Sequence, residues 1–270
     1  FADTVPGLLA LRRGNAQVSM EMWIENYREI YYDALNAGDI VDLGPNFPDS
    51  PQGWYVPTYM IEGDPARGIE PIAPDLRSVA DLPRYWDLFE DPEVPGKGRF
   101  YNCPTGWMCH DINRQKLKAY GLEEHFTAFD PGSDAALVAS LAAAYQRGLP
   151  WLGYYWEPTW VMGLYDMTML QEPAFSEDCW ESDMGCAYPP SQVRIAVHKS
   201  LPQRAPEVVE FLKAYQTTLE QNNQVLGQMQ AHGWSAEEAA LWFLREHEEV
   251  WSQWVPEAVA RRVRQALESE

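Results

Sequence analysis

Residues 133–160 read SDAALVASLAAAYQRGLPWLGYYWEPTW. The first part of this stretch, residues 133–147, is rich in alanine and leucine, opens on a Ser-Asp pair suited to capping a helix, and is followed by Gly148. Because such a cap and such a glycine mark the two ends of a helix, we predict a helix here. Residues 152–156 are apolar and aromatic, and they predict a strand directly afterwards. A helix followed at once by a strand favours an α/β fold.

Comparable patterns continue on both sides of this stretch. We predict further strands at residues 17–23, 40–43, 53–62, 99–103 and 193–198, and further helices at residues 4–13, 27–35, 113–120, 205–222, 235–251 and 257–267. The proline-rich, acidic segment 64–97 indicates a surface excursion with short helical turns. The alternation of strands and helices favours a parallel sheet with flanking helices.

The composition limits the kinds of partner. A chain of 270 residues with 46% hydrophobic content is long enough for one domain or for two lobes. Forty acidic against 20 basic residues give a formal charge of −20, which repels phosphate backbones and anionic lipids, so we expect no nucleic-acid partner. The acidity fits either high solubility or adaptation to saline surroundings. The sequence contains no run of 18 apolar residues, so it predicts no membrane-spanning helix.

The four cysteines form two close pairs, Cys103 with Cys109 and Cys179 with Cys186, each in a turn-rich context. Two local disulfides are one interpretation, and metal ligation is the other. Neither pair has the two-residue spacing of zinc knuckles, and no histidine lies at a matching interval, so we expect no metal site. Disulfides imply an oxidising compartment such as the periplasm. The sequence begins at Phe1 without a leader, so we expect that any secretory signal has been removed or lies outside it.

Common enzyme signatures are absent from the sequence. It contains no GxSxG elbow, no HExxH motif, no glycine-rich phosphate loop and no GxGxxG after a strand. The five histidines are scattered, and adjacent carboxylates such as Glu123 and Glu124 fall where solvated helix faces are expected. We therefore expect a binding protein without catalytic residues and without a cofactor.

Aromatic residues gather at turns and strand ends. The chain has 12 tryptophans and 14 tyrosines, many of them beside glycine or proline, as in residues 53–55, 106–107 and 154–160. For a single ring, packing in the core is the simpler interpretation. Several rings together suit a quaternary ammonium, which has no N–H to donate and is held by electron-rich ring faces. Glu157, next to Trp156, would attract a cation or would form a loop salt bridge.

Several longer stretches carry a resemblance to a known family. They are residues 14–27 (GNAQVSMEMWIENY), residues 53–59 (GWYVPTY), residues 103–173 with CPTGWMC and GYYWEPTWVMGLYDMTMLQEP, and the closing segments VRIAVHKSL, APEVVEFLKAY and WVPEAVARRVRQALE. In these stretches the chain resembles the glycine betaine/choline class of substrate-binding proteins of ABC transporters, the OpuAC-like or ProX-like family. The resemblance covers nearly the whole chain, although each motif alone is moderately specific.

The resemblance implies an α/β fold of the two-lobed periplasmic-binding-protein type (type II-like), with a ligand cleft between the lobes. It implies that residues 1–97 and 166–270 form lobe I and that residues 98–165 form lobe II. It also implies that a cage of aromatic rings captures a quaternary-ammonium osmolyte, such as glycine betaine, proline betaine or choline, and delivers it to the permease of an ABC importer. The expected ligand-binding residues are Trp23, Trp54, Tyr55, Trp107, Trp156, Glu157, Trp160 and Trp234.

Two departures from the family pattern keep alternatives open. The first strand-helix unit of the family has no counterpart before the segment that begins at Phe1, and Glu157 suits a net cation such as choline better than a zwitterion. Another methylated amine, such as trimethylamine N-oxide or carnitine, is an alternative ligand. The sensor domain of a receptor or of a fused transporter is an alternative function. We expect a secreted monomer at the periplasmic or extracellular face of the membrane, with or without a lipid anchor.

Overall fold

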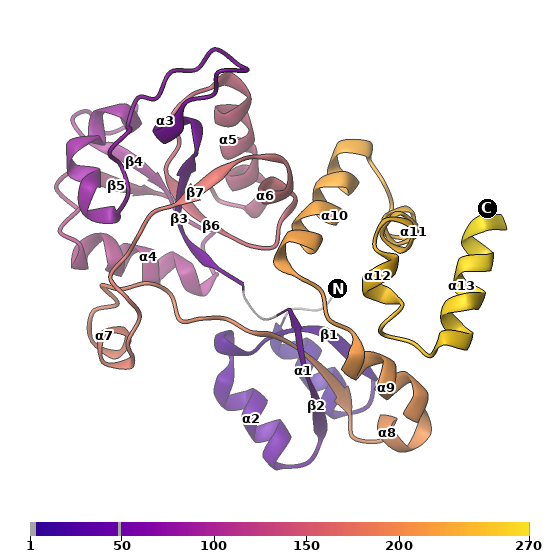
Figure 1. The fold of residues 1–270 in the computed structure, drawn as a ribbon. Coiled ribbons are helices and arrows are strands. Elements are labelled where there is room, and N and C mark those ends of the chain that lie inside the picture. The colour runs from indigo at the N-terminus through magenta and orange to yellow at the C-terminus, as the bar shows by residue number, and fades with distance from the viewer. Residues whose placement is uncertain (1–3, 48–49, 270) are drawn as a thin grey trace. The chain divides into compact units, whose positions relative to one another are not determined.

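The computed structural model describes residues 4–47 and 50–269, and the chain divides into two compact units (Figure 1). Unit 1 comprises residues 1–50, 158–163 and 190–270, and unit 2 comprises residues 51–157 and 164–189. Each unit is built on a sheet of its own. The chain passes from one unit to the other after residues 50, 157, 163 and 189.

Short and medium helices surround the strands. In chain order they are α1 (Thr4–Arg12), α2 (Arg28–Asn36), α3 (Tyr59–Glu62), α4 (Met108–Ala119), α5 (Asp134–Arg147), α6 (Trp160–Leu164), α7 (Glu177–Ser182), α8 (Leu201–Arg204), α9 (Pro206–Ala214), α10 (Leu219–His232), α11 (Ala236–Glu246), α12 (Glu248–Trp251) and α13 (Glu257–Ser269), with 3-10 turns η1 (Ile24–Asn26), η2 (Val79–Arg84) and η3 (Trp86–Phe89). Within residues 4–47 and 50–269, no helix combines the length and the apolar character that a membrane crossing requires.

Unit 2 contains a five-stranded mixed sheet in the order β5-β4-β6-β3-β7. Its strands are β3 (Gln52–Pro57), β4 (Gly98–Tyr101), β5 (Phe126–Phe129), β6 (Gly153–Trp156) and β7 (Met167–Met169). The helix α4 joins β4 to β5 and α5 joins β5 to β6, and such helical crossovers produce parallel neighbours. β4 is indeed parallel to β5 and β6, whereas β3 is antiparallel to β6 and β7. The predicted parallel sheet is therefore confirmed for one half only.

The helix α5 has the ends that its sequence predicts. The Ser133 hydroxyl accepts a hydrogen bond from the backbone N–H of Ala136 at 3.1 Å, and Gly148 ends the helix at φ = 67°, where glycine is favoured. Leu137 and Leu141 are fully buried on its inner face. Figure 1 shows α4 and α5 beside the strands of unit 2.

Unit 1 contains an antiparallel three-stranded sheet in the order β1-β8-β2. Its strands are β1 (Val18–Trp23), β2 (Ile40–Phe47) and β8 (Val193–His198). Side chains alternate between the two faces of β8, because successive residues of a strand point in opposite directions. Ala196 packs against residues of α1 and α2, whereas Ile195 and Val197 pack against residues of α8 and α9. The apolar core of unit 1 therefore covers both faces of its sheet.

At least four details differ from the predictions, one of them the break of the predicted helix 235–251 at His247, between α11 and α12. Residues 51–97 and 166–189 lie in unit 2 and not with lobe I, because β3 and β7 pair within the sheet that contains β6. The predicted strand 53–62 ends at Pro57 and is followed by the short helix α3. The predicted helix 205–222 is interrupted between α9 and α10. There the backbone N–H of Thr217 bonds to the carbonyl of Asn46, so a tertiary contact replaces a helical hydrogen bond.

Candidate functional site

Two tryptophans of unit 2 form a perpendicular pair. The ring centroids of Trp107 and Trp156 lie 5.2 Å apart, and their planes meet at 73°. Trp107 is 39% exposed and lies in the loop before α4, whereas Trp156 is half-buried at the end of β6. Two rings that meet at this angle form a corner, and a corner of this kind can contact a compact cation from two sides.

Tyrosines from the same strand extend this pair. Tyr155 stacks on Trp156 at 4.8 Å and 24°, and Tyr154 lies 6.1 Å from Trp156 at 27°. The Tyr154 hydroxyl donates to the side-chain oxygen of Gln52 at 2.8 Å. Because both rings lie nearly parallel to Trp156 and close to it, they restrict its orientation. Neither tyrosine is among the residues predicted to bind ligand, although the sequence YYW contains the signal.

A carboxylate lies next to the tryptophan pair. Glu157 follows Trp156 directly and is half-buried, and its Oε1 accepts a hydrogen bond from the Tyr55 hydroxyl at 3.3 Å. Burial and then the negative charge of Glu157 raise the pKa of Tyr55 far above its usual range. The phenol therefore keeps its proton and remains a donor to this carboxylate. The arrangement combines electron-rich rings with a negative charge, which favours a cationic group.

The loop that carries Trp107 is held by covalent and polar contacts. A disulfide joins Cys103 to Cys109, which confirms the first of the two predicted pairs. The side-chain oxygen of Asn102 accepts the backbone N–H of Cys103 at 2.9 Å and the side-chain N–H of Asn113 at 3.0 Å. Asn102 and Asn113 are both fully buried. Since these contacts reduce the freedom of the loop, Trp107 is presented at a low entropic cost.

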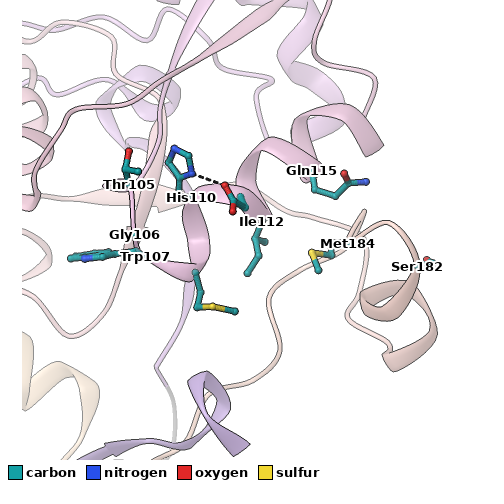
Figure 2. Close-up of a pocket in the computed structure, with 10 residues that line it drawn as sticks. Thr105, Gly106, Trp107, His110, Ile112, Gln115, Ser182 and Met184 are labelled. Carbon is teal, nitrogen blue, oxygen red and sulfur yellow. Dashed lines mark hydrogen bonds and ion pairs between the residues drawn. The ribbon is translucent and has the colours of Figure 1, made fainter. Parts of the chain in front are cut away.

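A surface depression of about 720 Å³ lies along the first turns of α4 (Figure 2). It combines apolar side chains with hydroxyl, amide, imidazole and carboxylate groups, and it is lined by Thr105, Gly106, Trp107, Met108, His110, Asp111, Ile112, Gln115, Ser182 and Met184. Figure 2 shows the hydrogen bond between the ring of His110 and the carboxylate of Asp111, which measures 2.7 Å. Trp107 belongs both to this depression and to the pair with Trp156.

The second predicted disulfide, Cys179 to Cys186, is also confirmed. Its loop lies over the fully buried side chain of Lys116, whose ammonium donates to the carbonyl of Cys186 and to Oε1 of Glu172, the latter at 2.5 Å. The Tyr188 ring lies 4.3 Å from the same ammonium. Burial lowers the pKa of Lys116, while the charge of Glu172 opposes this shift. A buried pair of this kind is a structural element of unit 2 and not part of the tryptophan corner.

The remaining predicted ligand residues lie in different environments. Trp54 is fully buried, packs 4.3 Å from Phe100, and donates its indole N–H to Oδ1 of Asn113 at 2.9 Å, so it is a core residue of unit 2. Tyr55 is also buried, and its link to the site is its hydroxyl group. Burial of this kind depends on residues from distant segments and has no local sequence signal.

Three predicted tryptophans belong to unit 1. Trp23 ends β1, is half-buried, and lies edge-on to Phe47 at 6.4 Å. Trp160 opens α6 and is also half-buried. Trp234 follows α10, stacks on His232 at 4.7 Å, and lies 6.1 Å from Trp242. The structure thus groups Trp107, Trp156 and Glu157 within unit 2.

Among residues 4–47 and 50–269, no three His, Cys, Asp or Glu side chains gather in a way suited to a metal ion.

Proteins of known function are similar to this chain over most of its length. The trimethylamine N-oxide-binding protein of Pelagibacter ubique is 25% identical over 246 residues, which are 90% of this chain and 76% of that protein. The glycine betaine/proline betaine-binding periplasmic protein of Escherichia coli is 24% identical over 210 residues, which are 68% of this chain. The chain spans only 60% of the length of the E. coli protein.

Solved structures show the same fold. The glycine betaine/L-proline-binding protein ProX of Borrelia burgdorferi superposes with a TM-score of 0.65 at 19% identity, over 97% of this chain and 86% of that one. Lactococcal OpuAC in its closed form with glycine betaine gives a TM-score of 0.64 at 19% identity, over 94% and 86%. These matches confirm the expected α/β fold of periplasmic binding proteins.

The sequence motifs and the fold thus agree with a family model. The model for the substrate-binding domain of the ABC-type glycine betaine transport system matches residues 2–246. This match covers both sheets, both disulfides and the tryptophan corner. The chain therefore belongs to the family of substrate-binding domains of ABC-type glycine betaine transport systems.

Proposed function

We propose that this protein captures a quaternary-ammonium osmolyte of the glycine betaine, proline betaine or choline class and delivers it to the permease of an ABC importer, without making or breaking a bond. The observation that carries the proposal is the perpendicular pair of Trp107 and Trp156. A quaternary ammonium cannot donate hydrogen bonds, so its recognition depends on ring faces around its methyl groups. A corner of two indoles supplies two such faces.

A third ring would complete the cage. By the resemblance of its motif we propose Trp23 of unit 1 for this role in the ligand-bound protein, with Trp160 and Trp234 as further members predicted from the sequence. Each ring face contributes about 0.5 to 2 kcal/mol to the binding of a cation. Three or four faces, assisted by Coulomb attraction, support an affinity on the order of micromolar.

Binding measurements with a ligand panel test this function. We expect calorimetry with glycine betaine, proline betaine, choline, carnitine and trimethylamine N-oxide to give a dissociation constant on the order of micromolar for at least one compound. Trp107→Ala should weaken that binding about tenfold or more, because it removes one wall of the corner. Met108→Ala is the matched control, since Met108 is 69% exposed, directly follows Trp107 at the start of α4, and lies within the same disulfide closure. No binding across the whole panel would refute the proposal.

The charge of Glu157 tests which ligand class is preferred. Glu157→Gln removes the negative charge and keeps an oxygen that can accept from the Tyr55 hydroxyl. We expect choline binding to weaken about fivefold, corresponding to the about 1 kcal/mol that a solvent-accessible ion pair contributes, while glycine betaine binding stays the same or improves. Equal weakening for both ligands would contradict a role of the charge in selectivity.

Trimethylamine N-oxide is the second candidate ligand. The relative from Pelagibacter ubique that bears this ligand in its name aligns with 90% of this chain. An N-oxide presents methyl groups to the rings like a betaine. Its oxygen accepts hydrogen bonds, so it needs a donor where the protein has the carboxylate of Glu157. In this case Glu157→Gln, which supplies an amide N–H, should strengthen binding of the N-oxide, whereas it weakens binding of choline.

We further propose that the protein works outside the cytoplasm as a monomer. Two disulfides within one chain support an oxidising compartment, and several relatives are named as periplasmic proteins. Cell fractionation tests the location, and partitioning of the protein into a detergent phase tests for a lipid anchor.

A sensor domain is the alternative function, and it would bind the same ligand without a permease. Ligand uptake by cells that lack the protein separates the two, since only the loss of an importer component abolishes uptake.

A further inference from the structure

A short helix directly after the tryptophan corner is fixed to another helix of unit 1. The chain leaves unit 2 after Glu157, and residues 158–163 belong to unit 1. This segment contains most of α6, which begins at Trp160. Trp156 and Glu157 are therefore separated from Thr159 by one proline only.

The first fixing contact is a buried hydrogen bond to α10. The backbone N–H of Thr159 donates to Oδ1 of Asn223 at 2.9 Å. Both residues are buried, with 9% exposure each. Since a buried amide without an acceptor is costly, this bond specifies the position of the first turn of α6 on α10.

The second fixing contact brings two backbones together. A methyl group added at Gly227 of α10 would lie 2.9 Å from the carbonyl oxygen of Gly163, and one added at Gly163 would lie 2.0 Å from the carbonyl oxygen of Asn223. Such distances leave no room for any side chain. The two helices therefore approach as closely as glycine permits, and α6 cannot slide on α10 without losing this contact.

We infer that Asn223 and Gly227 are positioning residues for ligand capture, acting through the short connection to Trp156 and Glu157. The inference rests on the proposed function. The backbone N–H of Glu157 donates to the carbonyl of Pro51 at 2.9 Å, so the connection is held at its strand end as well as at Thr159. Two residues span at most about 7 Å, and Pro158 fixes one backbone angle within them. A displacement of α6 on α10 therefore pulls on Glu157 and Trp156.

Substitutions in α10, which contains none of the predicted cage residues, test this role by calorimetry with the panel ligand that the unmodified protein binds best. Asn223→Leu should raise the dissociation constant about tenfold, because the Thr159 amide loses its acceptor. Asn223→Asp keeps an oxygen acceptor and should stay within about threefold of the unmodified protein. Gly227→Ala should raise the dissociation constant about tenfold, since its methyl group forces α6 away. Gln224→Ala, exposed on the same helix, is the control and should change affinity less than about twofold.

A merely structural role gives a different result. In that case Asn223→Leu and Gly227→Ala lower the thermal unfolding midpoint and leave the dissociation constant unchanged, which would overturn the inference. Hydrogen exchange of the peptide covering residues 153–160 supplies a readout that needs no ligand. Faster exchange at Glu157 in Asn223→Leu supports the inference, and unchanged exchange there overturns it. If no panel ligand binds the unmodified protein, the proposed function fails, whereas the exchange result still decides about the positioning contacts.

Discussion

The two disulfide-closed loops of unit 2 have nearly the same length, but their main contacts differ. Cys103 and Cys109 are six residues apart and enclose Trp107, which is 39% exposed. Cys179 and Cys186 are seven residues apart, and the carbonyl of Cys186 accepts a hydrogen bond from the fully buried Lys116. The same covalent closure thus presents an aromatic ring to solvent in one loop and covers a buried charge in the other.

This difference indicates that a disulfide does not determine the function of the loop that it closes. In the chain-entropy model, closures of six and seven residues stabilise a fold by similar amounts. What differs is the set of residues that tertiary packing brings to each loop. The first loop should therefore affect ligand binding, and the second should affect stability.

The largest expected effect concerns the charge beneath the second loop. Lys116→Met leaves the carboxylate of Glu172 buried without its cation, so the free energy of unfolding should fall by about 3 to 5 kcal/mol. Chemical denaturation measures this change. The double variant Lys116→Met/Glu172→Gln is the control, because it removes both charges and keeps an acceptor for the Tyr120 hydroxyl. No recovery of stability in the double variant would contradict a charge-based explanation.

Removal of each disulfide compares the two loops directly. Each pair of Cys→Ser substitutions should lower the free energy of unfolding by about 2 to 3 kcal/mol, since both closures are short. Loss of Cys103–Cys109 should in addition weaken ligand binding about tenfold, because Trp107 gains freedom that binding must then restrict. Loss of Cys179–Cys186 should weaken binding by a smaller factor, because its loop supplies Ser182 and Met184 to the depression beside Trp107 but no ring of the tryptophan corner. Calorimetry measures the dissociation constant of each variant. Equal effects of the two disulfides on affinity would contradict the distinction between the loops.

The smallest expected effect is a loss of stability at low pH that arises from Asp130, beside the first loop. Burial alone would raise the pKa of Asp130, but hydrogen bonds from Arg114 and Asn102, together with the His110 ring at 3.2 Å, outweigh it and leave the pKa below its ordinary value of 3.8. A carboxyl with a depressed pKa in the folded state contributes stability that is present above its unfolded pKa. That stability is lost as the pH falls through the folded pKa, below about 4. Between pH 5 and pH 2, the free energy of unfolding should therefore fall less steeply with decreasing pH for Asp130→Asn than for the unmodified protein. Chemical denaturation at a series of pH values measures this difference.

Much of unit 2 follows from local sequence. The helix α5 has the predicted cap at Ser133 and the predicted end at Gly148, because both depend on neighbouring backbone groups. The cysteine pairs form as their short spacing indicates. In unit 1, the sequence also carries a local signal for the interruption of the predicted helix 205–222. Thr218 and Gln221 form a capping box, which marks the start of α10.

The sequence by itself determined the α/β class, the disulfide pairs, the family and the candidates Trp107, Trp156 and Glu157, because these depend on local patterns and motifs. Only the tertiary structure decided that Trp54 is a core residue while Trp107 is exposed, although each follows a glycine. The physical reason is that burial depends on distant segments. Asn113 of α4 accepts the indole N–H of Trp54, and this pairing closes a separation of 59 residues along the chain.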